Sequence, residues 1–152
     1  MDKKEMNLLL VKVGAKHRRR SAYEFMKHDL TAGQPRMLNY IYQHDGCIQR
    51  EIATACNLEP ASVTSVLNSM EKVDLITRRP VKGDKRALEV RLTPKGLEKK
   101  KVVDEIFVLM AEECFRGFSE EEKVLTEGFL KRIIENMSNT NQHMTKADEK
   151  VL

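Results

Sequence analysis

Residues 49–73 read QREIATACNLEPASVTSVLNSMEKV, and this stretch decides the fold. Two helical segments lie within it, Gln49–Cys56 and Pro60–Val73, and only residues 57–59 separate them. A joint this short forces the two helices to cross steeply, which is the geometry of a helix-turn-helix. We therefore predict a helix-turn-helix at the centre of the chain.

The second of these helices has two different faces. Val63, Leu67 and Met70 recur at helical spacing and predict a buried stripe. In a helix-turn-helix the opposite face meets the major groove of DNA, where small hydroxyls allow a close approach and an asparagine pairs with adenine or a phosphate. Hydroxyl residues are also poor helix formers, so the alternative that they only solvate this helix is less favoured. The DNA contacts predicted for the helix pair are Gln49, Pro60, Ala61, Ser62, Thr64, Ser65 and Asn68.

A basic hairpin follows the helix pair. Residues 75–79 and 88–92 alternate apolar with polar side chains, and the polar segment 80–86 between them contains turn residues. From residue 78 to residue 95, seven basic residues oppose only two acidic ones. Such a hairpin is often only a soluble surface, but beside a DNA-reading helix it suits phosphate contacts and insertion of a guanidinium into the minor groove. The contacts predicted for the hairpin are Arg78, Arg79, Lys82, Asp84, Lys85 and Arg86.

Helices are also predicted on the N-terminal side of the helix-turn-helix. Residues 3–28 carry apolar residues at helical spacing, either as one long helix or as two helices broken near Gly14. Thr31 and Gln34 have the spacing of a capping box, which predicts a helix over residues 32–43 with a proline at the edge of its first turn. The first third of the chain is therefore expected to be helical.

Two more helices are predicted after the hairpin. Thr93 is a favourable N-cap before Pro94, and residues 119–122 form a second capping box. Past Ser138 the chain turns polar and is expected to fray. The apolar stripes of the two helices are Leu97, Val102, Val103, Ile106, Met110 and Cys114 in the first, and Leu125, Phe129, Ile133 and Met137 in the second.

The composition agrees with a mainly α protein that has one small β-hairpin. The 152 residues fit one domain, 33% of them are charged, 5% are aromatic, and the net charge of +4 permits a polyanionic partner. No apolar run is long enough for a membrane span or a signal peptide. We therefore expect a cytoplasmic protein with no membrane partner.

Catalysis and metal binding find no support in the sequence. No catalytic triad pattern, glycine-rich phosphate loop or HExxH motif is present, so we expect neither an enzyme nor a cofactor. Cys47, Cys56 and Cys114 have no CxxC spacing and no paired histidines nearby, which argues against a disulfide framework and against a zinc site. Buried or idle thiols are favoured over a redox switch.

Short motifs follow one another in a fixed order and spacing along the chain: Leu30, Thr31, Gln34 and Leu38, then Glu51–Ala53, Val63, Thr64, Leu67, Met70 and Glu71, and finally Leu75, Ile76, Arg78, Asp84, Arg86 and Leu92–Gly96. In these motifs the chain resembles the MarR family of bacterial transcription regulators from about residue 22 to residue 137. One departure is Asp74, because the family usually has a glycine at the end of the second helix; aspartate tolerates the left-handed conformation better than most residues.

The resemblance implies a winged helix-turn-helix core flanked by N- and C-terminal dimerisation helices. Residues 1–30 and 95–138 would form the dimer, residues 31–94 the DNA-binding unit, and residues 139–152 a frayed polar tail. The homodimer would bind a pseudo-palindromic site on double-stranded DNA, by family habit as a repressor. The hairpin of residues 75–92 would be the wing of this fold. Arg86 would enter the minor groove, and Asp84 would help to orient the wing.

The resemblance also implies an effector that releases the DNA. A small, often aromatic or phenolic molecule would bind between the dimer helices and the DNA-binding unit, with Met26, Met37 and Tyr40 as candidate lining, although ordinary core packing explains these residues better. Two alternatives stay open: a thiol or oxidant sensor that acts through Cys56 or Cys114, and a winged helix that binds proteins instead of DNA.

Overall fold

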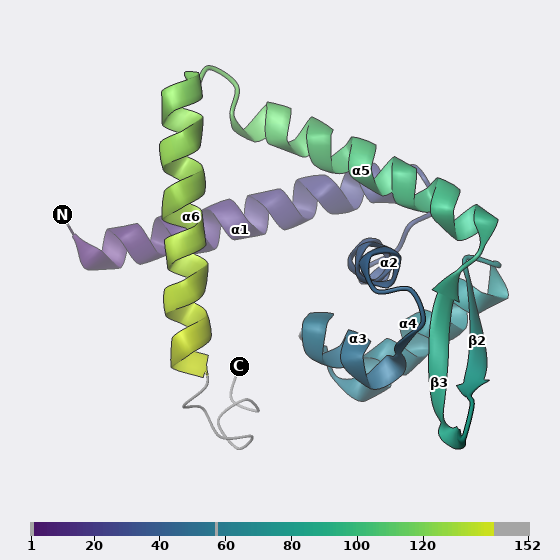
Figure 1. The fold of residues 1–152 in the computed structure, drawn as a ribbon. Helices are drawn as coiled ribbons and strands as arrows, with labels where there is room; N and C mark the ends of the chain where they lie inside the picture. Colours follow the sequence, from purple (N-terminus) through teal and green to yellow (C-terminus); the bar gives the residue numbers. More distant parts are fainter. Residues whose placement is uncertain (1, 57, 142–152) are drawn as a thin grey trace. The chain divides into compact units, whose positions relative to one another are not determined.

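The computed structural model describes residues 2–56 and 58–141, without the side chains of residues 85, 86 and 139–141. It confirms a mainly helical fold with a small antiparallel sheet (Figure 1). The chain divides into two compact units, Met1–Ala111 and Glu112–Leu152, and the boundary falls within the fifth helix. In order, the elements are α1 (Lys3–Met26), α2 (Gln34–Gln43), β1 (Cys47–Ile48), α3 (Gln49–Cys56), α4 (Pro60–Lys72), β2 (Ile76–Val81), β3 (Asp84–Leu92), α5 (Pro94–Cys114) and α6 (Glu120–Asn141).

The first helix, α1, is continuous. It passes Gly14 without a break, so the alternative of two helices is wrong. The carboxylate of Asp2 caps its start by accepting a hydrogen bond from the backbone N–H of Lys4 at 2.9 Å. Its buried residues, Ser21, Glu24 and Phe25, all lie near its C-terminal end. Most of the helix is therefore exposed in the single chain.

The second helix, α2, begins two residues later than the capping pattern predicts. Its N-cap is Gly33, whose φ of 87° is a conformation that glycine adopts most readily. Half of the predicted capping box forms, because the Gln34 side chain accepts a hydrogen bond from the Thr31 N–H at 3.0 Å, but no side chain caps the helix in return. The Gln34 amide instead donates to the Ser69 hydroxyl at 3.2 Å, which ties the start of α2 to α4.

The helix-turn-helix forms from α3 and α4. Helix α3 has the predicted bounds, and α4 ends one residue earlier than predicted. The three residues of the predicted apolar stripe of α4 are fully buried. Beyond the helix end, Asp74 has a φ of 62°, which is the left-handed conformation considered for this position from the sequence. Arg36 donates to the carbonyl oxygen of Cys56 at 2.7 Å and so caps the end of α3.

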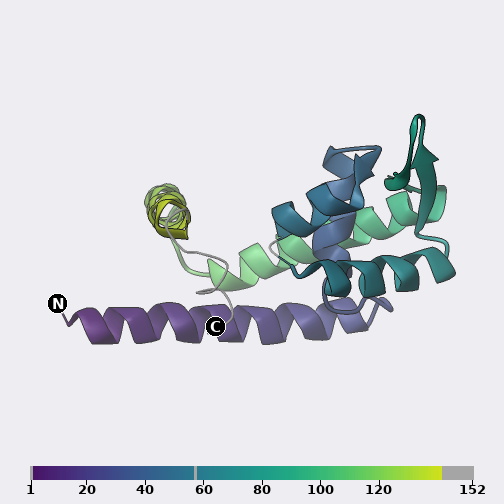
Figure 2. The same ribbon diagram turned by 90° about the horizontal axis from the view of Figure 1, so that it is seen from below.

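The hairpin has longer strands than the alternation of side chains predicts. Strands β2 and β3 extend into the segment expected to be the turn, and only residues 82–83 remain between them. Pairing runs from Ile76 opposite Leu92 to Val81 opposite Asp84, with an irregularity between Pro80 and Val81. The strand order is β1-β3-β2, so β3 is the central strand. Figures 1 and 2 show the hairpin projecting from the helices of its unit.

The buried face of α5 differs from the predicted stripe at both ends. Leu97 is 41% exposed, and Cys114 is exposed as well. A Cβ built on Gly96 would lie 2.0 Å from the carbonyl oxygen of Leu75, so the first turn of α5 contacts the Leu75 backbone at this glycine. The next residue, Leu97, is therefore turned outward. The residues that α5 buries are Gly96, Lys100, Val103, Ile106 and Met110.

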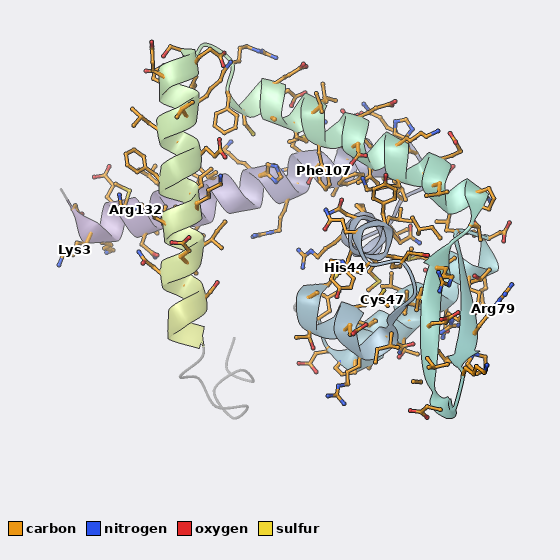
Figure 3. All side chains as sticks on the ribbon, in the orientation of Figure 1. Lys3, His44, Cys47, Arg79, Phe107 and Arg132 are labelled. Atoms are coloured by element: carbon orange, nitrogen blue, oxygen red, sulfur yellow. The ribbon has the colours of Figure 1, made fainter. Side chains whose placement is uncertain are left out.

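The core of the first unit is shared by its helices and its sheet. The rings of Phe25 in α1 and Phe107 in α5 meet edge to face, with centroids 5.8 Å apart; Figure 3 labels Phe107. Among the residues that the structure describes, no helix is both long and apolar enough to cross a membrane. The largest fully buried side chains are Met37, Leu38, Ile41, Ile52, Val63, Leu67, Met70, Leu75, Ile76, Val90 and Val103.

The second unit is built on α6. Its predicted capping box forms in full, because the Ser119 hydroxyl accepts from the Glu122 N–H at 3.2 Å and the Glu122 carboxylate accepts from the Ser119 N–H at 2.8 Å. The helix continues three residues past Ser138, where fraying was expected, and residues 142–152 of the predicted tail lie outside the described part. The large apolar side chains of α6 exposed in the single chain are Val124, Leu125, Phe129, Leu130, Ile134 and Met137.

Candidate nucleic-acid interface

One face of α4 is exposed and polar. All six residues predicted to contact DNA from this helix are exposed, while its apolar stripe faces the core. The hydroxyls of Ser62 and Ser65 have no hydrogen-bond partner within the described residues. These two side chains are therefore available to an external ligand. The six residues are Pro60, Ala61, Ser62, Thr64, Ser65 and Asn68.

The hydroxyl of Thr64 already has partners inside the protein. It donates to the carbonyl oxygen of Pro60 at 3.0 Å and accepts a hydrogen bond from the side-chain amide of Gln49 at 2.5 Å. Gln49 begins α3, so this bond braces the two helices of the pair against each other. Thr64 is exposed and Gln49 is half-buried, and the side chains of both are already engaged in this bond between the helices.

The side chain of Arg78 is largely buried and is paired. Its Nε donates to Glu71 at 3.1 Å, and its Nη2 donates both to Glu71 and, at 2.7 Å, to the side-chain oxygen of Asn68. The side chain of Arg78 is only 15% exposed. The hydrogen bond from Arg78 lowers the pKa of Glu71 below its ordinary value. No role was predicted for Glu71 from the sequence; the signal that could have shown one is a carboxylate in the last turn of α4, a few residues before the basic strand β2.

Other basic residues of the hairpin region also have partners inside the chain. Arg91 forms ion pairs with Asp45 and Glu89, and its pKa is raised by the hydrogen bond to Glu89 and by the charges of both carboxylates. The ammonium group of Lys95 donates to the carbonyl oxygen of Val73 at 2.7 Å and so caps the end of α4. Three of the basic residues counted along the sequence, Arg78, Arg91 and Lys95, are therefore engaged inside the chain.

The outer part of the hairpin carries exposed charge. Arg79, labelled in Figure 3, and Lys82 are exposed, and neither has an acidic partner among the described residues. Asp84 is exposed at the start of β3. The side chains of Lys85 and Arg86 lie outside the described residues, although their backbone is part of β3. The wing contacts predicted for these residues stay predictions.

The three residues named for an effector pocket differ in their surroundings, and the pocket stays a prediction. Met26 is 63% exposed, and Met37 is fully buried in the core. Tyr40 is half-buried, stacks on His44, and lines an open pocket of about 340 Å³ between α2 and α3. The other lining residues of that pocket are Arg50, Glu51, Thr54 and Ala55, which sequence analysis did not name.

The cysteines differ in their surroundings. Cys47 and Cys56 are buried, and Cys114 is exposed. Burial raises the pKa of Cys47 to about 11 and also raises that of Cys56. Thiols held in the protonated form are poor nucleophiles, so the two buried cysteines are unfavourably placed to sense an oxidant.

Comparison with known families is consistent with this geometry. A family model described as the MarR family matches residues 28–87, which include α2, α3, α4, β2 and the beginning of β3. The chain is 25% identical over 130 residues to an uncharacterized HTH-type transcriptional regulator, YybA, of Bacillus subtilis (strain 168). That match covers 86% of this chain and 87% of the relative.

Solved structures share the fold. The chain is similar to S. aureus MepR in its complex with DNA, with a TM-score of 0.76 and 25% identity, over 87% of this chain and 97% of that one. It is also similar to a MarR transcriptional regulator from Methanosarcina mazei Go1, with a TM-score of 0.83 over 91% and 99% of the two chains. At 17% identity, this second likeness concerns the fold alone.

Proposed function

We propose, on the premise that the chain belongs to the MarR family of winged helix-turn-helix transcription regulators, that it regulates transcription by binding specific sites on double-stranded DNA. The observation that carries this proposal is the exposed polar face of α4 beside a hairpin whose exposed cations, Arg79 and Lys82, have no acidic partner among the described residues. Helix α4 would lie in the major groove, and the hairpin would follow the phosphate backbone. Such a regulator acts at the DNA, so the proposal includes a cytoplasmic location.

The roles proposed for the wing residues follow from the resemblance to the MarR family. Arg86 would enter the minor groove, Asp84 would help to orient the wing, and Lys85 would add a phosphate contact. Arg86→Ala should then reduce the slope of log K against log salt concentration by about one unit, as expected for one lost phosphate contact.

Selection of bound duplexes from a random pool tests the function directly. We expect a pseudo-palindromic site whose affinity falls steeply between low and moderate salt. Ser65→Ala should change the preferred base at one position, at a cost of about 1–3 kcal/mol there if the contact is direct. Equal weakening on all sequences would assign Ser65 to a phosphate, and binding that is independent of salt would contradict DNA recognition.

A homodimer is the proposed form of the regulator. Exposed apolar side chains gather on two helices of the single chain, with Leu8 56% and Val13 65% exposed in α1 and Phe129 54% exposed in α6. Monomeric proteins rarely expose apolar surface of this extent, because its burial against a partner is favourable. The α4 helices of the two subunits, related by a two-fold axis, would then bind the two half-sites of a pseudo-palindromic DNA sequence.

Molar mass from light scattering tests the dimer. The wild-type chain should have twice the mass of one 17.5 kDa chain, and Val13→Glu should shift the population toward monomer and weaken DNA binding. Lys12→Glu is the matched control, because it changes an exposed polar neighbour on the same helix. A monomeric wild-type chain would refute this part of the proposal.

The proposed sign of regulation is repression, with release by a small, aromatic or phenolic effector. Binding of the selected duplex, measured with and without a panel of phenols and aromatic carboxylates, tests the effector. Peroxide in a parallel experiment tests the alternative of thiol sensing, which would rest on the exposed Cys114 more than on the buried Cys56. Cys114→Ser should abolish a peroxide effect and leave a phenol effect unchanged.

A further inference from the structure

The side-chain amide of Asn68 has a fixed orientation. Its oxygen accepts a hydrogen bond from Nη2 of Arg78 at 2.7 Å. A guanidinium has five donors and no acceptor, so the amide atom that faces it is the oxygen and the amide nitrogen lies on the other side. Asn68 is exposed, and its nitrogen has no partner among the described residues. The NH₂ group is therefore the part of this amide that is offered to a ligand.

Arg78 is itself held in place. Glu71, three residues after Asn68 on α4, accepts hydrogen bonds from Nε and Nη2 of the same guanidinium. These bonds engage two of the nitrogens of Arg78, and its side chain is only 15% exposed. A guanidinium fixed in this way has little freedom to follow a phosphate, whereas the neighbouring Arg79 is exposed on the same strand. Strand β2 thus carries one arginine turned to the protein and one open to solvent.

We propose that Arg78 is a positioning residue that makes Asn68 a hydrogen-bond donor toward the DNA bases, and that Arg78 itself contacts no phosphate. This inference rests on the proposed function and adds how one residue of α4 selects bases. Guanine, adenine and thymine all present acceptors in the major groove, whereas cytosine presents a donor. Asn68 should therefore disfavour cytosine on the strand that it faces.

The salt dependence of binding separates the two neighbouring arginines. Arg78→Met and Arg79→Met form a matched pair, because methionine keeps an unbranched apolar side chain and removes all donors. On the duplex selected by the wild-type protein, Arg79→Met should reduce the salt slope by about one unit, and Arg78→Met should leave the slope unchanged. A slope reduced by Arg78→Met would identify it as a phosphate ligand and overturn the proposal.

The base preference gives a second, independent readout. Arg78→Met frees the Asn68 amide to rotate, so discrimination against cytosine at one position should fall by about tenfold. Asn68→Asp keeps the shape of the side chain and the oxygen that faces Arg78, but it replaces the donor with an acceptor. This variant should move the preference toward cytosine, whose amino group donates. Thermal unfolding of both variants shows whether the fold is retained, and Asn68→Asp tests the proposal even if Arg78→Met does not fold.

The outcomes distinguish this inference from the function on which it rests. Wild-type protein that selects no sequence would overturn the proposed function and this inference together. Selective wild-type binding, with an unchanged preference at the affected base pair in Asn68→Asp, would overturn only the role of Asn68 as a donor. A preference that shifts in both variants, with a salt slope that is reduced only in Arg79→Met, is the expected result.

Discussion

Replacement of Gly96 by alanine tests how closely α5 must approach the backbone of Leu75, the residue before β2. The added Cβ would lie 2.0 Å from the carbonyl oxygen of Leu75 and 3.1 Å from its carbonyl carbon. Real Cβ atoms essentially never lie within 3.0 Å of another heavy atom, so the two backbone segments would have to separate by about 1 Å. No flexible side chain can absorb this movement, because the obstructing atoms belong to the backbone.

The expected loss of stability follows from the same contact. Overpacking of this kind costs about 1–3 kcal/mol, and the hydrogen bond from the Thr93 N–H to the Leu75 carbonyl (3.1 Å) is strained with it, which adds about 1 kcal/mol. Alanine is the better helix former by about 1 kcal/mol, which offsets part of the loss. The net loss of about 1–3 kcal/mol corresponds to a melting temperature lower by roughly 3–10 °C.

Thermal unfolding at one fixed protein concentration is the assay, because the proposed dimerisation would make the melting temperature depend on concentration. Gly14→Ala is the matched control: this glycine also lies within a helix, and the nearest atom to its added Cβ is the mobile guanidinium end of Arg18 at 3.4 Å. The control should be as stable as the wild type or more stable by up to about 1 kcal/mol. Equal melting temperatures for the two variants would refute the reasoning.

Three further outcomes are expected. Thr93→Ala removes the side chain that caps α5 and should lower the free energy of unfolding in denaturant by about 1–2 kcal/mol; an unchanged midpoint would contradict this role. Because Arg78 lowers the pKa of Glu71, their pair stabilises the fold above the ordinary carboxyl pKa of 4.5, and this stabilisation is lost as the pH falls through the lowered value. Glu71→Gln should therefore flatten the dependence of stability on pH in the acid range, and an unchanged profile would argue against the pair. Since burial raises the pKa of Cys47 to about 11, a thiol reagent at neutral pH should modify Cys114 faster; equal rates would show that burial does not protect the inner thiol.

Features encoded within a few residues could be predicted from the sequence. The three-residue joint of the helix pair, the Thr93 cap of α5 and the capping box at Ser119 each depend on neighbours along the chain, and the structure has all three. The left-handed backbone at Asp74 belongs to the same class. Local geometry decides such features, so a short stretch of sequence carries enough information to place them.

Features that depend on distant residues could not be predicted in this way. A charge count could not show that Arg78 is paired with Glu71, because it treats every arginine as free to meet DNA. The apolar periodicity of α5 included Leu97, but the contact of Gly96 with the backbone of Leu75 rotates that side chain outward. In both cases the deciding partner lies in another element of the fold, and its position is fixed only by tertiary packing.

The strand order β1-β3-β2 also bears on how the protein avoids joining its sheets to those of other molecules. Open strand edges invite pairing with other chains, and a sheet of three strands has two of them. One edge, β1, is only two residues long. The other, β2, contains Pro80, which lacks an N–H donor, and its pairing with β3 becomes irregular at the next residue. The hairpin can therefore project from its unit without offering a flat, fully hydrogen-bonding edge on which aggregates could grow.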